Sequence, residues 1–498
     1  MNTVQARLAG AFAVVGLVAL SLPGIAVAAP DPPFTPGASG AGDDYFPFSG
    51  NGGYDVSHYD LDLDYSPPAP DPAPLVGKLD GVATITLRAT QNLDRFNLDL
   101  RDLDVKSLTV NGVSAREVAR PAPGETVAGA AYWQVQNNGE RVWELTVQPR
   151  PRLKAGDQAT VVVRYGGDTT RPTDIEGFLY GWVTTRDGAM VVGEPEGNMT
   201  WFPASDHPTD KATYSYEITV PEGKVAVANG LQSQDPTTEG GRSTWHWDAP
   251  DLQASYLATA SVGDFELSSS KTASGLPIVD AVDRDLPAAD RDITDASLAL
   301  QPRMIEFFEK QFGAYPFNSY GSIVDDDTVG YALETQTRPV YSRRAREGTV
   351  AHELAHQWFG NAVSPSRWRG IWLNEGWATY LEWLWAEENG GATAEESFRG
   401  VMRIAKSKPF WDTIVADPGP LHLFADANYD RGAATLFALR DKIGDEDFFE
   451  GTRLWLSLYD DGTATTEDFE AVFEKVSGEE LSTFFDVWLR TPEKPTTW

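Results

Sequence analysis

Two short stretches in the second half of the chain decide its fold. Residues 349–360 read TVAHELAHQWFG, and residues 371–380 read IWLNEGWATY. Around both stretches the apolar side chains recur at helical spacing, which predicts helices over 347–359 and 371–388. The catalytic possibilities of the chain follow from the polar residues that these two helices carry.

The polar residues of the two helices form a metal-ligand pattern. His352 and His356 stand four positions apart, so their imidazoles lie one turn apart on the same helix face. Glu375 follows nineteen positions later and offers a carboxylate from the second helix. Two nitrogens and one oxygen leave the fourth tetrahedral position open, as in catalytic and not structural zinc sites. The pattern predicts one zinc ion per chain.

Two further glutamates complete the predicted centre. Glu353 lies between the histidines, beside the position of an activated water, and is the predicted general base. Histidines that bind a metal usually need a partner for the second ring nitrogen. Glu382 follows Glu375 by seven residues, on the same helical face, and is the candidate for that role. An exposed surface glutamate is the alternative interpretation of Glu382.

Outward from the centre, the chain divides into a β-rich part and a mainly α-helical part. Apolar and polar residues alternate with period two over 59–65 and 96–100, which is typical of strands with one buried face. We therefore expect an N-terminal antiparallel β domain, a sandwich or saddle, over 54–265. The helical patterns place the catalytic domain at 266–498, which makes the fold α+β and multidomain.

The first residues are typical of an exported protein. Arg7 precedes an apolar run over 8–22, and the small residues at 26–28 provide a cleavage site, so we predict a signal peptide over 1–28. The run is too short for a membrane anchor, which needs about 20 residues. Residues 29–53 are rich in proline, glycine and serine and are predicted to form a flexible arm. The mature protein is expected to be secreted.

Composition excludes several classes of partner. With 73 acidic and 40 basic residues the formal charge is −33, which argues against nucleic-acid binding. There is no cysteine, so no disulfide contributes to stability. After the signal peptide no segment is apolar enough to span a membrane.

The acidic run 325–327 is interpreted as a solvated loop, with calcium binding as the alternative.

Several stretches outside the two helices also match one family. Trp201-Phe202-Pro203, Asp206-His207-Pro208 and 210–213 resemble a turn-and-strand block, and 429–433 (YDRGA) resembles a segment with a catalytic tyrosine. With the metal motif, the chain from about Tyr54 onwards resembles the aminopeptidase N family of gluzincin zinc metallopeptidases. The resemblance implies a thermolysin-like catalytic domain and peptide substrates with a free N-terminus.

The resemblance also assigns roles to individual residues. It implies that His352, His356 and Glu375 bind zinc and that Glu353 is the base. Tyr429 would donate a hydrogen bond to the tetrahedral oxyanion. A half-buried packing tyrosine is the alternative interpretation of Tyr429.

Family members hold the substrate amine with carboxylates, one of them in a Gly-Ala-Met-Glu-Asn signature. The matching stretch here is Tyr331-Ala332-Leu333-Glu334-Thr335, which places Ala332 and Glu334 among the substrate-binding residues. The second amine anchor would be Glu194, with Glu196 as its competitor. Tyr331 and Thr335 depart from the signature and affect the expected preference for free N-termini.

Two alternatives to an aminopeptidase stay open from the sequence. Only 123 residues follow Glu375, so we expect the large C-terminal helical domain of many family members to be missing and the cleft to be more open. An endopeptidase, or another small-substrate hydrolase with the same zinc, would fit that expectation. A catalytically silent binding protein on the same scaffold is the third hypothesis.

Overall fold

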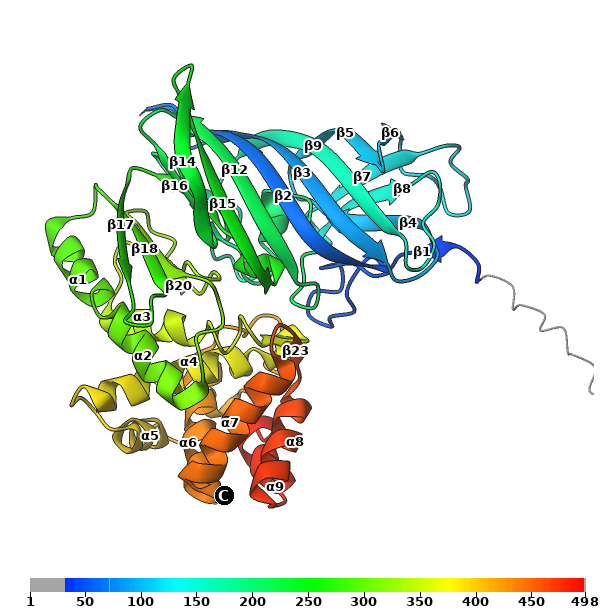
Figure 1. Ribbon diagram of the computed structural model, residues 1–498. Helices are drawn as coiled ribbons and strands as arrows, with labels where there is room; N and C mark the ends of the chain where they lie inside the picture. The colour runs from blue at the N-terminus through cyan, green and yellow to red at the C-terminus, as the bar shows by residue number, and fades with distance from the viewer. Residues whose placement is uncertain (1–31, 71, 497–498) are drawn as a thin grey trace, which may run out of the picture. The chain divides into compact units, whose positions relative to one another are not determined.

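The computed structural model describes residues 32–70 and 72–496, and those from 34 onwards fall within one compact unit. The predicted signal peptide at 1–28 lies outside the described residues. Within this unit a β-rich N-terminal part is followed by a mainly helical part (Figure 1). This order confirms the α+β fold class that the sequence predicts.

A large curved sheet dominates the N-terminal part (Figure 1). It has twelve strands in the order β1-β4-β8-β7-β6-β5-β9-β3-β2-β12-β15-β14. Most neighbouring pairs are antiparallel, as predicted, but β1–β4, β6–β7 and β2–β12 are parallel. The strands are β1 (Thr35–Pro36), β2 (Tyr54–Ser66), β3 (Gly77–Ala89), β4 (Leu93–Asp99), β5 (Asp104–Val110), β6 (Val113–Glu117), β7 (Ala131–Asn137), β8 (Val142–Gln148), β9 (Gln158–Thr169), β12 (Ala212–Pro221), β14 (Leu231–Glu239) and β15 (Arg242–Gln253).

Alternation along β2 explains how this sheet builds a core. Leu61 and Leu63 are fully buried, whereas Asp60 and Asp62, which alternate with them, are exposed. The same core contains Trp182 from a second sheet, of order β10-β11-β16-β13. Its strands are β10 (Gly181–Thr184), β11 (Ala189–Val192), β13 (Val225–Ala228) and β16 (Ala260–Gly263). The strands of the four-stranded sheet are buried at every position, and their packing with the large sheet in a common core stabilises the β-rich part.

A third sheet begins where the second one ends. β16 ends at Gly263, and β17 begins two residues later in a five-stranded sheet of order β17-β18-β19-β21-β20. Its strands are β17 (Phe265–Lys271), β18 (Pro277–Asp283), β19 (Tyr320–Asp325), β20 (Ala332–Leu333) and β21 (Val340–Ser342). The predicted boundary at 265 coincides with this change of sheet. It stays a prediction, because contacts join both sides into one unit.

Helices make up most of the remaining chain, and their aromatic residues form its core. Trp372 and Trp377 are fully buried, and Phe359 stacks on Trp377 with ring centroids 4.3 Å apart. The helices are α1 (Ala288–Leu298), α2 (Gln301–Phe312), α3 (Glu347–Ala355), α4 (Trp372–Glu388), α5 (Ala394–Met402), α6 (Gly432–Ile443), α7 (Asp445–Tyr459), α8 (Thr466–Ser477) and α9 (Ser482–Phe485). A short parallel pair, β22 (Ser364–Pro365) with β23 (Thr463–Ala464), joins two loops.

The prediction of a flexible arm over 29–53 is wrong for residues 34–53. Phe46 is buried and packs edge-on against Trp368, with ring centroids 6.4 Å apart. Asp43 accepts a hydrogen bond from the Trp368 amide at 2.8 Å and lies 3.4 Å from the imidazole of His207. Composition misled the prediction because these few contacts join residues far apart in the sequence. The segment instead contacts both the β-rich and the helical parts.

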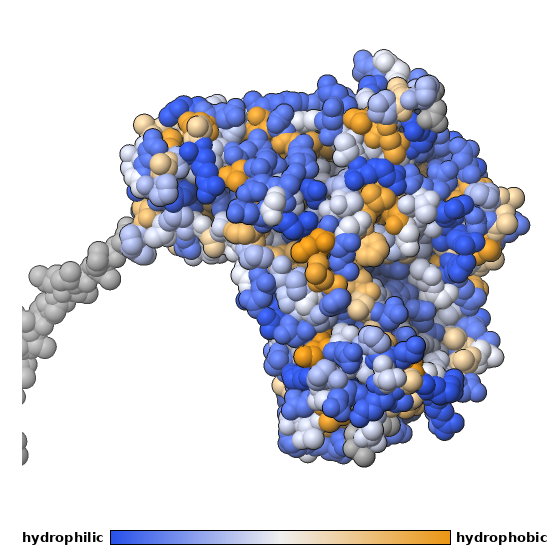
Figure 2. All heavy atoms as spheres, turned by 180° about the vertical axis from the view of Figure 1, so that it is seen from behind, coloured by the Kyte–Doolittle hydropathy of each residue, from blue (hydrophilic) through white to orange (hydrophobic). Residues whose placement is uncertain are grey.

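The face of the molecule in Figure 2 is polar over most of its area. Figure 2 shows hydrophobic side chains on one face scattered in small patches among polar ones. Among the described residues, no helix has the length and apolar character needed to cross a membrane.

Candidate active site

Helices α3 and α4 bring the three predicted metal ligands together. Oε2 of Glu375 lies 3.2 Å from Nε2 of His352 and 3.5 Å from Nε2 of His356. One ligand atom from each residue lies within 4.8 Å of the other two. His352 lies in the last turn of α3, and His356 is the first residue after that helix. Glu375 lies in the first turn of α4.

The other ring nitrogens of both histidines have acceptors. Nδ1 of His352 donates to Oε1 of Glu382 at 2.6 Å, and Nδ1 of His356 donates to the carbonyl of Phe359 at 3.0 Å. These bonds fix the tautomers so that both Nε2 lone pairs face Glu375. Two such nitrogens and a carboxylate oxygen are a donor set that suits zinc, with a position left for substrate. The structure thus places Glu382 beside the centre, as the helical spacing predicts.

Glu353 lies at the same centre but faces a different neighbour. Its carboxylate, that of Glu334 and a nitrogen of His356 form a second group within 4.8 Å. Burial raises the pKa of Glu353 to about 8, and the nearby histidines oppose that rise. A cation held by the three ligands would oppose it further. Glu353 is therefore placed beside the metal ligands and directed towards the cavity.

Tyr429 lines the same cavity from a π-helical turn over Ala427–Arg431, just before α6. Its ring stacks on that of His352, with centroids 5.9 Å apart and an interplanar angle of 20°. Gly432 follows the turn and packs against Gly376 of α4, where a Cβ on Gly376 would lie 2.9 Å from the Gly432 backbone. Only glycine permits this approach of α4 to α6. The close contact sets the phenol beside the ligand helix.

The segment 331–335 holds its predicted anchor deep in the cavity wall. Glu334 is 2% exposed, and its Oε1 has no hydrogen-bond partner within 32–70 and 72–496. Its backbone carbonyl accepts from Asn361 at 2.8 Å and from Gln357 at 3.2 Å, both just beyond α3. The hydroxyl of Tyr331 donates to the Leu179 carbonyl at 2.6 Å. Tyr331, which replaces the glycine of the family signature, thus links this wall of the cavity to the β-rich part. Ala332 also lines the cavity.

The structure separates Glu194 from its competitor Glu196. Glu194 lines the cavity at 7% exposure, and its Oε1 lacks a hydrogen-bond partner in the described chain. Burial raises the pKa of Glu194 well above its usual value, and the carboxylate of Glu334 adds to the rise. Glu196 instead forms an ion pair with Arg141. Of Glu194 and Glu196, only Glu194 therefore has a carboxylate that is free to face a substrate.

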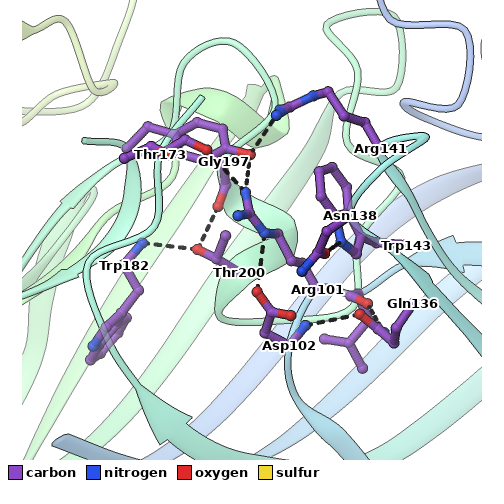
Figure 3. Close-up of polar contacts among 12 residues, drawn as sticks. Arg101, Asp102, Gln136, Asn138, Arg141, Trp143, Thr173, Trp182, Gly197 and Thr200 are labelled. Atoms are coloured by element: carbon purple, nitrogen blue, oxygen red, sulfur yellow. Dashed lines mark hydrogen bonds and ion pairs between the residues drawn. The ribbon is translucent and has the colours of Figure 1, made fainter. Parts of the chain in front are cut away.

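A polar network around Gly197 and Thr200 holds this loop in place (Figure 3). Thr200 donates to the Gly197 carbonyl at 2.7 Å and accepts from the Trp182 amide at 2.9 Å. Arg101 donates to the Thr173 carbonyl at 3.2 Å, and its guanidinium lies 4.5 Å from the centre of the Trp143 ring. Thr200 thus joins this loop to β10 of the four-stranded sheet through Trp182, and the amide of Arg101, just after β4 of the large sheet, donates to the carbonyl of Met199 at 2.8 Å.

The cavity that these residues line has a volume of about 510 Å³. Further lining residues that the sequence did not single out include Asp174, Phe178 and Phe424. Phe178 is 52% exposed, which is unusual for a large apolar side chain. Nothing in its local sequence pattern points to a site, because it lies in an irregular loop between β9 and β10. The cavity therefore offers an apolar rim beside an acidic interior.

Comparison with known proteins agrees with this arrangement. The Peptidase M1 N-terminal domain matches residues 56–257, and the Peptidase family M1 domain matches residues 297–488. Endoplasmic reticulum aminopeptidase 1 of Rattus norvegicus is 29% identical over 360 residues, which is 66% of this chain and 38% of the relative. Aminopeptidase N of Streptomyces lividans is 26% identical over 348 residues, 64% of this chain and 39% of the relative. The chain thus matches less than half of the length of these relatives.

Solved structures match over a larger share of both chains. The M1 zinc metallopeptidase from Deinococcus radiodurans is 27% identical, with a TM-score of 0.79 over 92% of this chain and 99% of that chain. A glutamate-to-alanine mutant of that protein is described as bound to a Tyr-Ser-Ala substrate. Two family domains in the expected order and a shared architecture show that the chain belongs to the aminopeptidase N family of zinc metallopeptidases, peptidase family M1.

Proposed function

We propose that this chain is a zinc-dependent aminopeptidase that removes single residues from the free N-termini of peptides. One observation carries the proposal: Glu194 and Glu334 are buried beside the metal ligands, and each has a carboxylate oxygen without a protein donor in the described residues. A buried carboxylate without a partner is costly. The ammonium group of a peptide N-terminus would supply the missing charge-assisted hydrogen bonds.

The roles of the remaining residues follow from where they lie. His352, His356 and Glu375 would hold the zinc, which when bound would polarise a carbonyl as a Lewis acid and acidify water. Glu353 takes a proton from the attacking water and passes it to the leaving amine. Tyr429 donates a hydrogen bond to the oxyanion as it develops. The two amine anchors would fix the first peptide bond at the zinc, and hence the removal of one residue at a time.

The proposal is tested with one peptide in two forms. Tyr-Ser-Ala, the substrate named for the Deinococcus protein, is offered free and N-acetylated to the zinc-loaded chain. We expect release of tyrosine from the free form only, and loss of activity on zinc removal with a chelator. Glu353→Gln is the matched control, because it keeps all three ligands and should retain zinc while losing turnover.

Other outcomes would each contradict a different part of the proposal. Equal cleavage of both forms would support an endopeptidase and remove the anchor roles of Glu194 and Glu334. No cleavage of either form by a zinc-loaded protein would favour a binding protein on the same scaffold. Normal activity of Glu353→Gln would remove the proposed base.

We further propose that the chain is exported and its signal peptide removed. Support comes from the charged, apolar and small-residue regions within residues 1–28. Expression in an exporting host and N-terminal sequencing of the product would test the proposal. A product that begins at Met1 or stays inside the cell would contradict it.

A further inference from the structure

Three aspartates from separate segments of the chain converge at one edge of the five-stranded sheet. None of them is close in sequence to the predicted zinc ligands. Asp187 lies in the turn between β10 and β11, Asp283 ends β18, and Asp326 directly follows β19. One carboxylate oxygen from each lies within 4.8 Å of those of the other two. β18 and β19 are parallel, with Val282 opposite Val324, so their carboxyl ends meet at one edge of the sheet.

The inner carboxylates of this acidic cluster lack partners. Asp283 is 1% exposed; its Oδ1 accepts from the amide of Asp285 at 2.6 Å, but its Oδ2 has no donor in the described structure. Asp325, which precedes Asp326, is also fully buried with a free Oδ2. The interpretation of 325–327 as a solvated loop is therefore wrong for Asp325. Oδ2 of Asp283 and Oδ2 of Asp325 on the neighbouring strand are thus both buried without donors, and that of Asp283, which belongs to the cluster, points to a cation there.

Nearby basic side chains leave these two oxygens uncovered. Lys224 lies 2.7 Å from Asp264 and 3.5 Å from Asp187, and the oxygens of Asp187 also accept hydrogen bonds from the Asp264 amide at 2.8 Å and the Thr185 hydroxyl at 3.0 Å. Arg171 pairs with Asp327 at 2.8 Å, one residue beyond the cluster. Within the described part of the chain, neither Lys224 nor Arg171 forms an ion pair with Asp283. The buried Oδ2 of Asp283 is therefore left without a covering cation.

We propose that Asp187, Asp283 and Asp326 bind one calcium ion. All the donors are oxygens, which suit hard cations and not zinc. Calcium–oxygen distances of about 2.3–2.6 Å allow two ligands of one ion to lie up to about 5 Å apart, and the oxygens here meet that limit. An ion here would neutralise the buried charge of Asp283.

The ion would join the β-rich part to a wall of the active-site cavity. Asp187 lies in the turn that joins two strands of the four-stranded sheet, whereas the chain after Asp326 continues through Val329 and Tyr331 to Glu334. These residues line the cavity that contains the metal ligands. Calcium would therefore fix one end of the segment that carries a proposed amine anchor. Its effect would be on stability and on the KM of free-amine peptides.

The test measures calcium binding directly, independently of the proposed activity. Zinc-loaded full chain is freed of calcium on a chelating resin, and its zinc content is checked by mass spectrometry. Equilibrium dialysis with radioactive calcium should give one ion bound per chain, and the Tm should rise by several degrees with added CaCl2. Magnesium at equal concentration should bind at least about tenfold more weakly, because it demands tighter octahedral geometry.

Two variants and a control decide the assignment. Asp283→Asn and Asp326→Asn should each lose calcium binding and the calcium-dependent rise in Tm. Asp326 is exposed, so its variant keeps the test valid if Asp283→Asn does not fold. Asp441→Asn, an exposed aspartate on α6, should bind calcium like the wild type. Absence of calcium binding at millimolar concentration, equal binding of magnesium, or retained binding in both variants would overturn the proposal, whether or not the chain cleaves peptides.

Discussion

Glu382, about two turns along α4 from Glu375, accepts a 2.6 Å hydrogen bond from Nδ1 of His352. Helix α4 thus carries both the proposed metal ligand Glu375 and the residue that holds the imidazole of His352 in place. Because Glu382 holds the imidazole in the tautomer that exposes Nε2, we expect it to act on metal affinity through His352 and not by contact with the metal.

Replacement of Glu382 by glutamine should weaken zinc binding about 10- to 100-fold. The amide keeps the shape of the side chain but loses the negative charge that favours the Nδ1 proton. Competition with a chelator of known affinity measures the change. Glu388→Gln, an exposed glutamate at the end of the same helix, is the control and should bind zinc normally. Equal affinities in the two variants would remove Glu382 from the centre.

Tyr429→Phe should lower kcat by about 100- to 1,000-fold and leave KM nearly unchanged. The phenyl ring keeps the stacking on His352, but no hydroxyl is left to stabilise the oxyanion. Steady-state kinetics with a free-amine peptide measure both constants. Tyr459→Phe at the end of α7 is the control, since that ring lies outside the cavity lining. A large rise in KM with normal kcat would instead assign Tyr429 to substrate binding.

Glu194→Gln and Glu334→Gln should each lower kcat/KM for free-amine peptides about 10- to 100-fold, mainly through KM. Each variant removes a counter-charge for the substrate ammonium. Glu196→Gln is the matched comparison on the same loop: it breaks the ion pair with Arg141, so it should lower the Tm more than it changes KM. The reverse pattern, with KM changed by Glu196→Gln alone, would exchange the roles of the two glutamates.

Lys211 gives a prediction about pH and stability. Its Nζ donates to the carbonyls of Asn361 and Ala362 at 2.8 and 2.9 Å, and burial lowers its pKa from 10.5 to about 7, against the opposing charge of Asp461. Between pH 7 and 10.5 the unfolded chain therefore binds more protons at this site than the native chain. The contribution of Lys211 to the free energy of unfolding should rise with pH in this window, by at most about 1.4 kcal/mol per pH unit.

Urea unfolding across pH 7.5 to 10 checks this expectation. The free energy of unfolding of Lys211→Met should follow pH with a smaller upward slope than that of the wild type. Lys408→Met, an exposed lysine, should keep the wild-type slope. Parallel curves for wild type and Lys211→Met would show that Lys211 keeps the same protonation in both states.

Local spacing predicts the zinc helices and the positions of His352, His356 and Glu375, because residues one turn apart share a helix face whatever packs around them. It places Glu382 beside them for the same reason. Spacing does not show which of Glu194 and Glu196 is free to bind a substrate amine. That depends on Arg141, which lies 53 residues before Glu194 and pairs with Glu196.

The features that the sequence did not predict depend on long-range contacts. The segment 34–53 has the composition of a linker, yet Asp43 bonds to Trp368, which is 325 positions away. Asp325 belongs to a charged run that usually lies in solvent, but the pairing of β18 with β19 buries it. In both cases the residues that bury the segment lie far away in the sequence, so a local pattern could not reveal them.

The contact between Gly376 and Gly432 has a consequence for how the proposed site tolerates change. Because main chain meets main chain there, no side chain separates the helix that bears Glu375 from the turn that bears Tyr429. The spacing of the carboxylate and the phenol is thus fixed by two polypeptide backbones and does not depend on rotamer choice. A single added methyl at either glycine would act as a wedge, moving the phenol relative to the carboxylate without altering either group chemically.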